Sequence, residues 1–318
     1  MTPTKYDEAL EDYYEAISLS QSQLDKIDSV SATMSAIMLT EYPDSGIYAQ
    51  GSFSTDTLVK PLTSVQSNGK PGEFDVDIVV EREWSGARNS LEDTANVLKN
   101  AGKDPDESKQ KCVRVDYADE PSGVGFHVDI IPTRLKGSGS GREVPVRRID
   151  DWTDSDAKYF ADWFNARCDE QPNLRKIAVI LKRLRDLNGQ TENLKSILVL
   201  TLAEKYYSDN NSLMTDLIAT LDGINQHVAE VNWELNNPIN NDEDLSVTVE
   251  DKDSLKSFVS DITSNIDDAI SSNDNEALED IFKVGFVAPE ESKTEVTAAV
   301  TITPLAATPR AYADDSRQ

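Results

Sequence analysis

Three aspartates occupy two strand-like segments of the sequence at spacings that could bring their carboxylates together. Asp75 and Asp77 lie in the segment from Glu73 to Val80, in which acidic and apolar residues alternate. Because residues two apart in a strand point to the same face of a sheet, both carboxylates are predicted to face one point. Asp129 lies in a second strand-like segment, from Val124 to Ile131, and supplies a third carboxylate.

Carboxylates held this close repel one another unless a cation lies among them, so a divalent metal is the economical explanation. Oxygen ligands and a need for phosphate partners favour Mg²⁺ over zinc. Upstream, Gly51 allows close approach of a phosphate to the backbone, and Ser52 offers a hydroxyl donor. Asp-x-Asp and Gly-Ser are each common in strand edges and turns. Their order along the chain is what indicates a catalytic site.

This ordered set resembles the polymerase-β-type nucleotidyltransferase superfamily, whose signature is Gly-Ser, a spacer, Asp-x-Asp and a later strand aspartate. More narrowly, the chain is similar to the bacterial CD-NTases, relatives of cyclic GMP-AMP synthase and oligoadenylate synthase that act in the antiphage signalling called CBASS. The similarity covers roughly residues 5 to 288 and includes Gly51–Thr57, Trp152–Asp156 with Tyr159 and Trp163-Phe164, Leu181–Asp186, Lys195-Ser196, Asn237-Pro238 and Phe282–Phe286.

The resemblance implies a Mg²⁺-dependent nucleotidyltransferase that joins NTPs into a cyclic di- or trinucleotide second messenger. Asp75 and Asp77 would hold two Mg²⁺ ions, for which Mn²⁺ could substitute. Asp129 would bind only the ion beside the attacking 2′- or 3′-hydroxyl, which that ion would activate.

The same resemblance assigns nucleotide binding to Gly51, Ser52, Lys182, Lys195 and Ser196. Lys182 lies off the apolar stripe of its predicted helix, so it can face a cleft or remain solvated. Ser196 begins the next apolar helix, where its hydroxyl can bind phosphate or cap the helix.

Two other functions use the same residues. One is a template-independent nucleotidyltransferase that modifies an RNA or a protein. The other is a binding protein built on an inactive nucleotidyltransferase fold, against which the three intact aspartates argue.

The charge balance bears on partners and location. The 58 acidic residues outnumber the 31 basic ones among 318, which gives a formal charge of −27. Because proteins that bind duplex DNA or RNA carry a basic face, no DNA activator is expected.

Cys112 and Cys168 form neither a disulfide framework nor a zinc set. The chain opens without a signal-peptide pattern, and its longest apolar stretch, residues 197–203, is too short to span a bilayer. We therefore expect a cytoplasmic protein without membrane association.

The order of elements predicts an α+β, bilobal protein. Residues 1–150 are expected to form the nucleotidyltransferase core, a small mixed sheet with helices, behind an N-terminal spine helix over residues 5–42. Strands are expected at 46–53, 74–80 and 143–149, with 112–117 paired to 124–131, and a helix at 90–101. Residues 151–288 are expected to form a helical lobe.

Two regions outside the triad complete the expectations. Residues 289–318 are expected to be a flexible tail that could serve a regulatory protein partner. The aromatic residues between 152 and 163 are assigned to the core rather than to base stacking, and His127 and His227 are given no role.

Overall fold

The computed structural model describes residues 3–62, 74–117, 125–137, 141–191, 193–283 and 285–289. Its helices are η1 (Pro3–Tyr6), α1 (Asp7–Ile17), α2 (Gln21–Glu41), α3 (Gly51–Ser54), α4 (Ala87–Asn100), α5 (Ala157–Glu170), α6 (Leu174–Leu187), α7 (Ser196–Tyr206), α8 (Leu213–Ala229), η2 (Leu245–Thr248), α9 (Lys252–Ser272) and α10 (Asn275–Phe282). Its strands are β1 (Gly46–Gln50), β2 (Phe74–Glu81), β3 (Pro105–Asp106), β4 (Val113–Tyr117), β5 (Phe126–Leu135), β6 (Arg142–Val146), β7 (Asp151–Asp154), β8 (Asn236–Asn237) and β9 (Asn240–Asp244).

One mixed sheet forms the first lobe. Its strand order is β1-β2-β5-β4-β3, and β6 and β7 extend it from the far end of β5. Strands β2 and β5 are parallel, whereas β1 with β2, and β4 with β5, are antiparallel. The predicted α+β class is confirmed, and so is the predicted pairing of β4 with β5.

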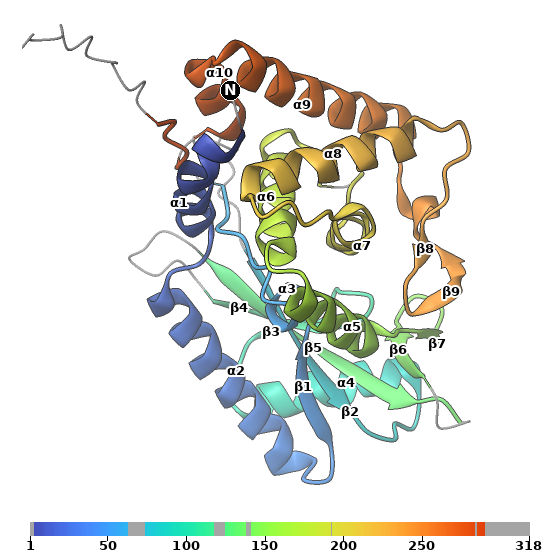
Figure 1. Ribbon diagram of the computed structural model, residues 1–318. Helices are drawn as coiled ribbons and strands as arrows, with labels where there is room; N and C mark the ends of the chain where they lie inside the picture. The colour runs from blue at the N-terminus through green and yellow to red at the C-terminus, as the bar shows by residue number, and fades with distance from the viewer. Residues whose placement is uncertain are drawn as a thin grey trace, which may run out of the picture.

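Helices α2 and α4 cover one face of this sheet. Every second residue of β2, including Val76, Ile78 and Val80, packs against them in a shared apolar core. The alternate residues, Asp75 and Asp77, therefore face the other side, as the period-two pattern requires. Figure 1 shows α3 and α5 on that side, between the sheet and helices α6, α7 and α8.

The helix predicted over residues 5–42 is two helices. The chain breaks at residues 18–20, where Ser18 Oγ donates to Tyr14 O and Ser20 forms a capping box with Gln23. Serine ends one helix and begins the next because its hydroxyl satisfies backbone groups that a helix terminus leaves unpaired. The continuous apolar stripe concealed this break.

The two helices belong to different cores. Leu10, Tyr13 and Ile17 of α1 pack with the C-terminal helices, whereas Ile27 and Met34 of α2 pack with the sheet. The boundary at residue 150 stays a prediction, but the first helix of the chain shares the core of the helical lobe.

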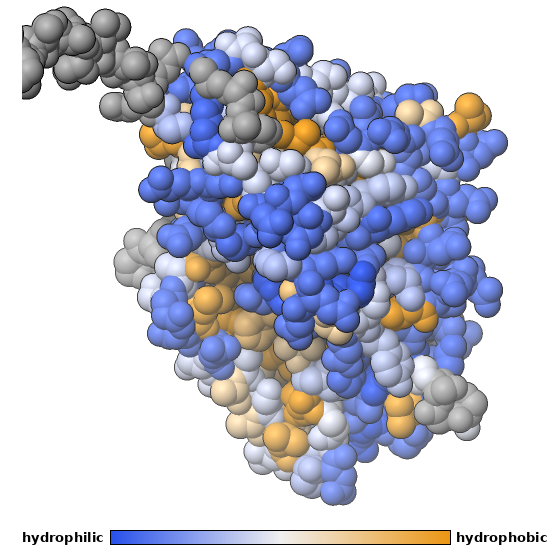
Figure 2. Space-filling model, viewed as in Figure 1, coloured by the Kyte–Doolittle hydropathy of each residue, from blue (hydrophilic) through white to orange (hydrophobic). Residues whose placement is uncertain are grey.

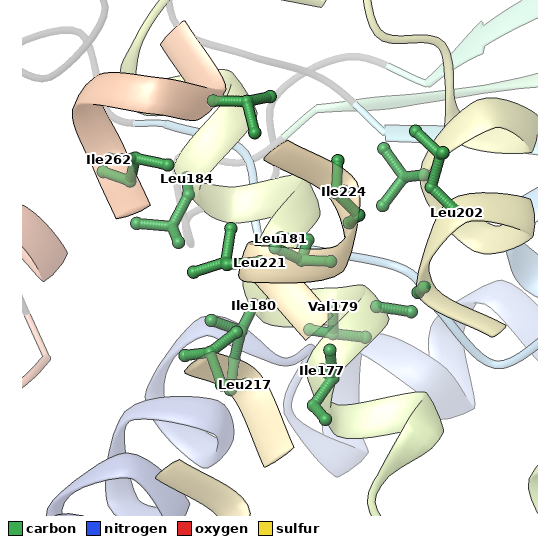
Figure 3. Close-up of a cluster of buried hydrophobic side chains, with 14 of the residues drawn as sticks. Ile177, Val179, Ile180, Leu181, Leu184, Leu202, Leu217, Leu221, Ile224 and Ile262 are labelled. Atoms are coloured by element: carbon green, nitrogen blue, oxygen red, sulfur yellow. The ribbon is translucent and has the colours of Figure 1, made fainter. Parts of the chain in front are cut away.

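Helix α6 runs through the centre of the helical lobe. Figure 3 shows its apolar side chains meeting those of α7, α8 and α9, and the labelled residues are Ile177, Val179, Ile180, Leu181, Leu184, Leu202, Leu217, Leu221, Ile224 and Ile262. Because this helix is buried on nearly all sides, its polar residues must find partners inside the protein.

Several further expectations can be compared with the fold. The helix predicted at 90–101 is α4. The small hairpin of β8 and β9 was not anticipated. Apart from Pro289, the expected tail lies outside the described residues. Within the described part of the chain, none of the helices has the length and apolar character needed to cross a membrane.

Candidate active site

The register between β2 and β5 brings the predicted carboxylates together. Asp77 pairs with Asp129 across the parallel strands, and Asp75 pairs with His127 two residues earlier. Paired residues of adjacent strands point to the same face, so all four side chains lie on the side of the sheet opposite α2 and α4.

Gly51 forms the turn that leads from β1 into α3, directly above Asp77. Its φ of 68° lies in the left-handed region, which glycine adopts without steric cost. A Cβ at this position would collide with Asp77 Oδ2. Glycine is therefore required here both by the backbone conformation and by the close approach to the carboxylate.

Asp75 and Asp77 differ in their electrostatic environment. Burial raises the pKa of Asp77 to about 7, and the charges of Asp129 and Asp75 add to this shift. Burial acts on Asp75 in the same direction, but a hydrogen bond from His127 and its charge lower the pKa of Asp75 below its ordinary value. His127 Nε2 lies 2.5 Å from Asp75 Oδ1, and this pairing raises the pKa of the histidine against the effect of burial.

Asp129 is held by an arginine of the neighbouring strand. Arg114 of β4 pairs with Asp129 in the antiparallel register. Its Nε donates to Asp129 Oδ1 at 2.7 Å and its Nη2 to Oδ2 at 2.8 Å. This two-pronged geometry is the strongest form of an arginine–carboxylate pair. Consistent with it, the pKa of Arg114 is raised despite burial of the guanidinium.

Lys182 reaches from α6 to the Gly-Ser turn. Its Nζ donates to Ser52 Oγ at 2.8 Å and to Thr57 O at 2.6 Å. Only 4% of Lys182 is exposed. Burial lowers its pKa to about 7, and the charge of Arg185 acts in the same direction.

A cleft of about 1340 Å³ separates the sheet from the helical lobe. Seven of the eight residues predicted for the site line it: Gly51, Ser52, Asp75, Asp77, Lys182, Lys195 and Ser196. Asp129, the eighth, is among the buried residues and does not line this cleft. Thr153–Asp156 and the β8–β9 hairpin form other walls of the cleft.

The start of α7 brings Lys195 and Ser196 to the cleft. Arg185 Nη1 donates to Ser196 Oγ at 3.3 Å and to Leu194 O at 3.1 Å, which fixes this segment against α6. Lys195 occupies the N-cap position without capping through its side chain. Ser196, the first residue of α7, lines the cleft, so the N-terminus of this helix lies at the cleft. A helix N-terminus favours the binding of anions such as phosphate.

The carboxylates fit a hard cation in part. Asp75 and Asp77 both line the cleft, and a bound cation would relieve the repulsion that adds to the effect of burial on the pKa of Asp77. In the part of the chain that the structure describes, no three or more His, Cys, Asp or Glu side chains are arranged together as metal ligands. The two oxygens of Asp129 are instead engaged by Arg114.

Two site residues were not identified from the sequence. His127 was considered and left without a role, although its position two residues before Asp129 placed it on the same strand face. Arg114 was not considered. The predicted pairing of its strand with that of Asp129 was the available signal, but the register was needed to make them partners.

Comparison with known proteins supports the predicted resemblance to the CD-NTases. The family model named Second Messenger Oligonucleotide or Dinucleotide Synthetase domain (SMODS) matches residues 4–167. No curated protein matches the chain in sequence.

Solved structures share the fold. The CD-NTase CdnG of Bradyrhizobium diazoefficiens, in complex with GTP, is 16% identical with a TM-score of 0.70, over 87% of this chain and 95% of that one. Vibrio cholerae DncV, a cyclic AMP-GMP synthase in complex with nonhydrolysable GTP, is 20% identical with a TM-score of 0.60, over 76% and 70%. CdnC of E. coli MS115-1, in a complex with HORMA-deltaN, is 14% identical with a TM-score of 0.62, over 88% and 98%.

At these identities the similarities establish a common fold, and they confirm the predicted resemblance to the CD-NTases. Because the SMODS model matches more than half of its residues, the chain belongs to the family of second messenger oligonucleotide or dinucleotide synthetase domains.

Proposed function

We propose that this protein joins NTPs into a cyclic di- or trinucleotide second messenger for antiphage signalling. The observation that carries the proposal is the cleft in which Asp75 and Asp77 face the Gly51–Ser52 turn and Lys182. Carboxylates beside a phosphate-binding turn and a buried lysine are the components that nucleotidyl transfer requires.

Each residue has a role in this proposal. Lys182 and Ser52 already contact one another and would bind the triphosphate, together with Ser196 and Lys195 at the start of α7, which contacts α6 through Arg185. Asp75 and Asp77 would hold Mg²⁺ or Mn²⁺, with Asp129 as a further ligand. When bound, these ions would activate the attacking hydroxyl and neutralise the departing pyrophosphate.

The chemistry has to occur at least twice to close a ring. In each step a ribose hydroxyl oxygen forms a bond to an α-phosphorus, and the bond to pyrophosphate breaks. The linear product must then rebind so that its own hydroxyl can attack. The volume of the cleft, about 1340 Å³, leaves room for two nucleotides, since pockets for single drug-sized ligands are about 300–1,000 Å³.

The proposed partners follow from the same comparisons. CdnG and DncV were solved with GTP or its nonhydrolysable analogue, so we propose NTPs as substrates. CdnC was solved in a complex with HORMA-deltaN, which supports a regulatory protein partner here, as predicted for the C-terminus.

The test is incubation of the pure protein with the four NTPs and Mg²⁺, followed by mass analysis of the products. A cyclic oligonucleotide supports the proposal. A modified RNA or protein acceptor would instead favour the alternative transferase, and the absence of any product would favour a binding protein.

The matched variant is Asp75→Asn with Asp77→Asn, which removes the charges at nearly constant shape. Turnover should fall to a trace while the fold persists, because the lost groups repel one another in the absence of metal. Substantial turnover by this variant would show that the site is wrongly assigned.

A further inference from the structure

Arg114 binds the carboxylate of Asp129, which is the third ligand expected for the metal site. Both oxygens of Asp129 accept hydrogen bonds from it, at 2.7 and 2.8 Å. Asp75 and Asp77 line the cleft, whereas neither Asp129 nor Arg114 does. Two carboxylates of the triad therefore face the cleft, and the third is turned toward β4.

The pair is well shielded and well oriented. The side chains of Arg114 and Asp129 are 19% and 11% exposed. Their strands are paired at these two residues, so the backbone itself sets the guanidinium opposite the carboxylate. A two-pronged pair in such a setting is more persistent than a surface ion pair, because water competes less for its hydrogen bonds.

A guanidinium and a divalent cation compete for one carboxylate. Each carboxylate oxygen has two lone pairs, and Arg114 uses one on each oxygen of Asp129. A metal ion would therefore have to bind the remaining lone pairs beside the guanidinium or displace one of its hydrogen bonds. Like charges also repel at this distance, so Arg114 left in place would weaken binding of a cation beside Asp77.

We propose that Arg114 is a positioning residue that holds Asp129 out of the metal site in the free protein and releases it when a metal-bound nucleotide occupies the cleft. This inference rests on the proposed function. Under it, the free protein binds metal through Asp75 and Asp77, and the third ligand is recruited together with substrate. The pair thus limits assembly of the complete site to the substrate-bound state.

The experiment measures binding of Mn²⁺ to the full chain by electron paramagnetic resonance of the free ion, without nucleotide. Arg114→Gln should tighten Mn²⁺ binding roughly tenfold, since it removes one nearby positive charge and one competitor. Asp129→Asn alone should weaken binding through the loss of a nearby negative charge, but less than the loss of a direct ligand would, because that carboxylate is not yet a ligand. In the Arg114→Gln background, Asp129→Asn should abolish the gain.

Arg134→Gln is the matched control, because it also removes an arginine–carboxylate pair from the sheet. Arg134 Nε lies 2.9 Å from Glu143 Oε2, between β5 and β6. This variant should leave Mn²⁺ affinity unchanged. A gain equal to that of Arg114→Gln would show a general charge effect and overturn the proposal.

A second measurement does not require Arg114 variants to fold. With a nonhydrolysable NTP present, Asp129→Asn should weaken Mn²⁺ binding about tenfold more than it does without nucleotide, because a direct ligand is then lost as well as a charge. Equal weakening in both states would show that Asp129 already binds metal beside Arg114, and the inference would fail. An absence of Mn²⁺ binding, or binding insensitive to Asp75→Asn with Asp77→Asn, would instead refute the proposed metal site itself.

Discussion

At the level of single residues, the site pairs most of its charged groups with one another. Asp75 pairs with His127, and Asp129 pairs with Arg114. Lys182 instead donates a hydrogen bond to the neutral hydroxyl of Ser52. Asp77 forms no ion pair with a described side chain, and burial, together with the charges of Asp129 and Asp75, raises its pKa to about 7. A cation in the cleft would be drawn first to the carboxylate that repulsion has destabilised.

Lys182 should make nucleotide binding depend on pH. Its pKa is lowered to about 7, so at pH 8 most of the amine is neutral in the free protein. A triphosphate beside it favours the ammonium and raises this pKa. Binding at pH 8 should therefore take up close to one proton, and at pH 6 almost none.

Calorimetry of nonhydrolysable NTP binding, in two buffers of different ionisation enthalpy, measures this uptake. Lys182→Met should remove the uptake by this amine and leave only the part due to Asp77, whose pKa is also about 7. Lys195→Met, which also removes a lysine from the cleft, should retain the full uptake. Identical heats in both buffers at pH 8 would contradict the assigned role of Lys182.

Gly51→Ala should cost activity far more than stability. The added methyl group would push Asp77 from its position, and a displacement of about 1 Å in a catalytic group can lower turnover about 100-fold. Gly102→Ala is the control, because Gly102 has a similar φ of 76° with open space around its Cα. Both variants should lose about 1 kcal/mol of unfolding free energy from backbone strain. Equal turnover in the two would disprove the contact argument.

At the level of elements, the break at residues 18–20 divides the N-terminal segment between two cores. The apolar spacing of residues 5–42 predicted helix correctly, because that spacing is a local property. It could not indicate which core each half would join, since α1 and α2 carry similar apolar faces. Contacts with residues far away in the sequence decided which core each helix joins. For α1 these include Phe282 and Phe286, which pack on Tyr13.

Leu10→Ala tests this assignment of α1. Leu10 is fully buried in the helical lobe, so the substitution should lower the free energy of unfolding by about 2–5 kcal/mol. Leu39→Ala, at a residue of α2 that is 40% exposed, should change it by less than about 0.5 kcal/mol. Urea unfolding followed by circular dichroism gives both values. A neutral Leu10→Ala would mean that α1 does not stabilise this lobe.

At the level of the whole molecule, the charge is strongly negative. The formal charge is −27, and most of the face seen in Figure 2 is hydrophilic. Among the described residues, the cleft is lined by three basic side chains, Lys182, Arg185 and Lys195, and by six acidic ones: Asp75, Asp77, Asp154, Asp156, Asp186 and Glu243. A few basic side chains in an acidic cleft can contact one triphosphate, whereas an extended polyanion would be repelled by the overall charge.

Duplex DNA or RNA should therefore not activate the protein. At physiological salt, adding either polymer should change the rate of NTP turnover by less than about twofold, because an acidic surface releases few counterions from a duplex. Measuring pyrophosphate release with and without a long duplex is sufficient. A stimulation of tenfold or more would mean that a basic face forms despite the overall charge.

By itself, the sequence determined the α+β class, most of the strands around the triad, and seven residues that line the cleft. Alternation with a period of two is local, so the common face of Asp75 and Asp77 could be derived without knowledge of any neighbour. Only the tertiary structure decided which partner each charged group has. The β2–β5 and β4–β5 registers set His127 against Asp75 and Arg114 against Asp129, and α6 carries Lys182 to Ser52. These pairings join residues on different elements, and such contacts arise from chain packing rather than from local spacing.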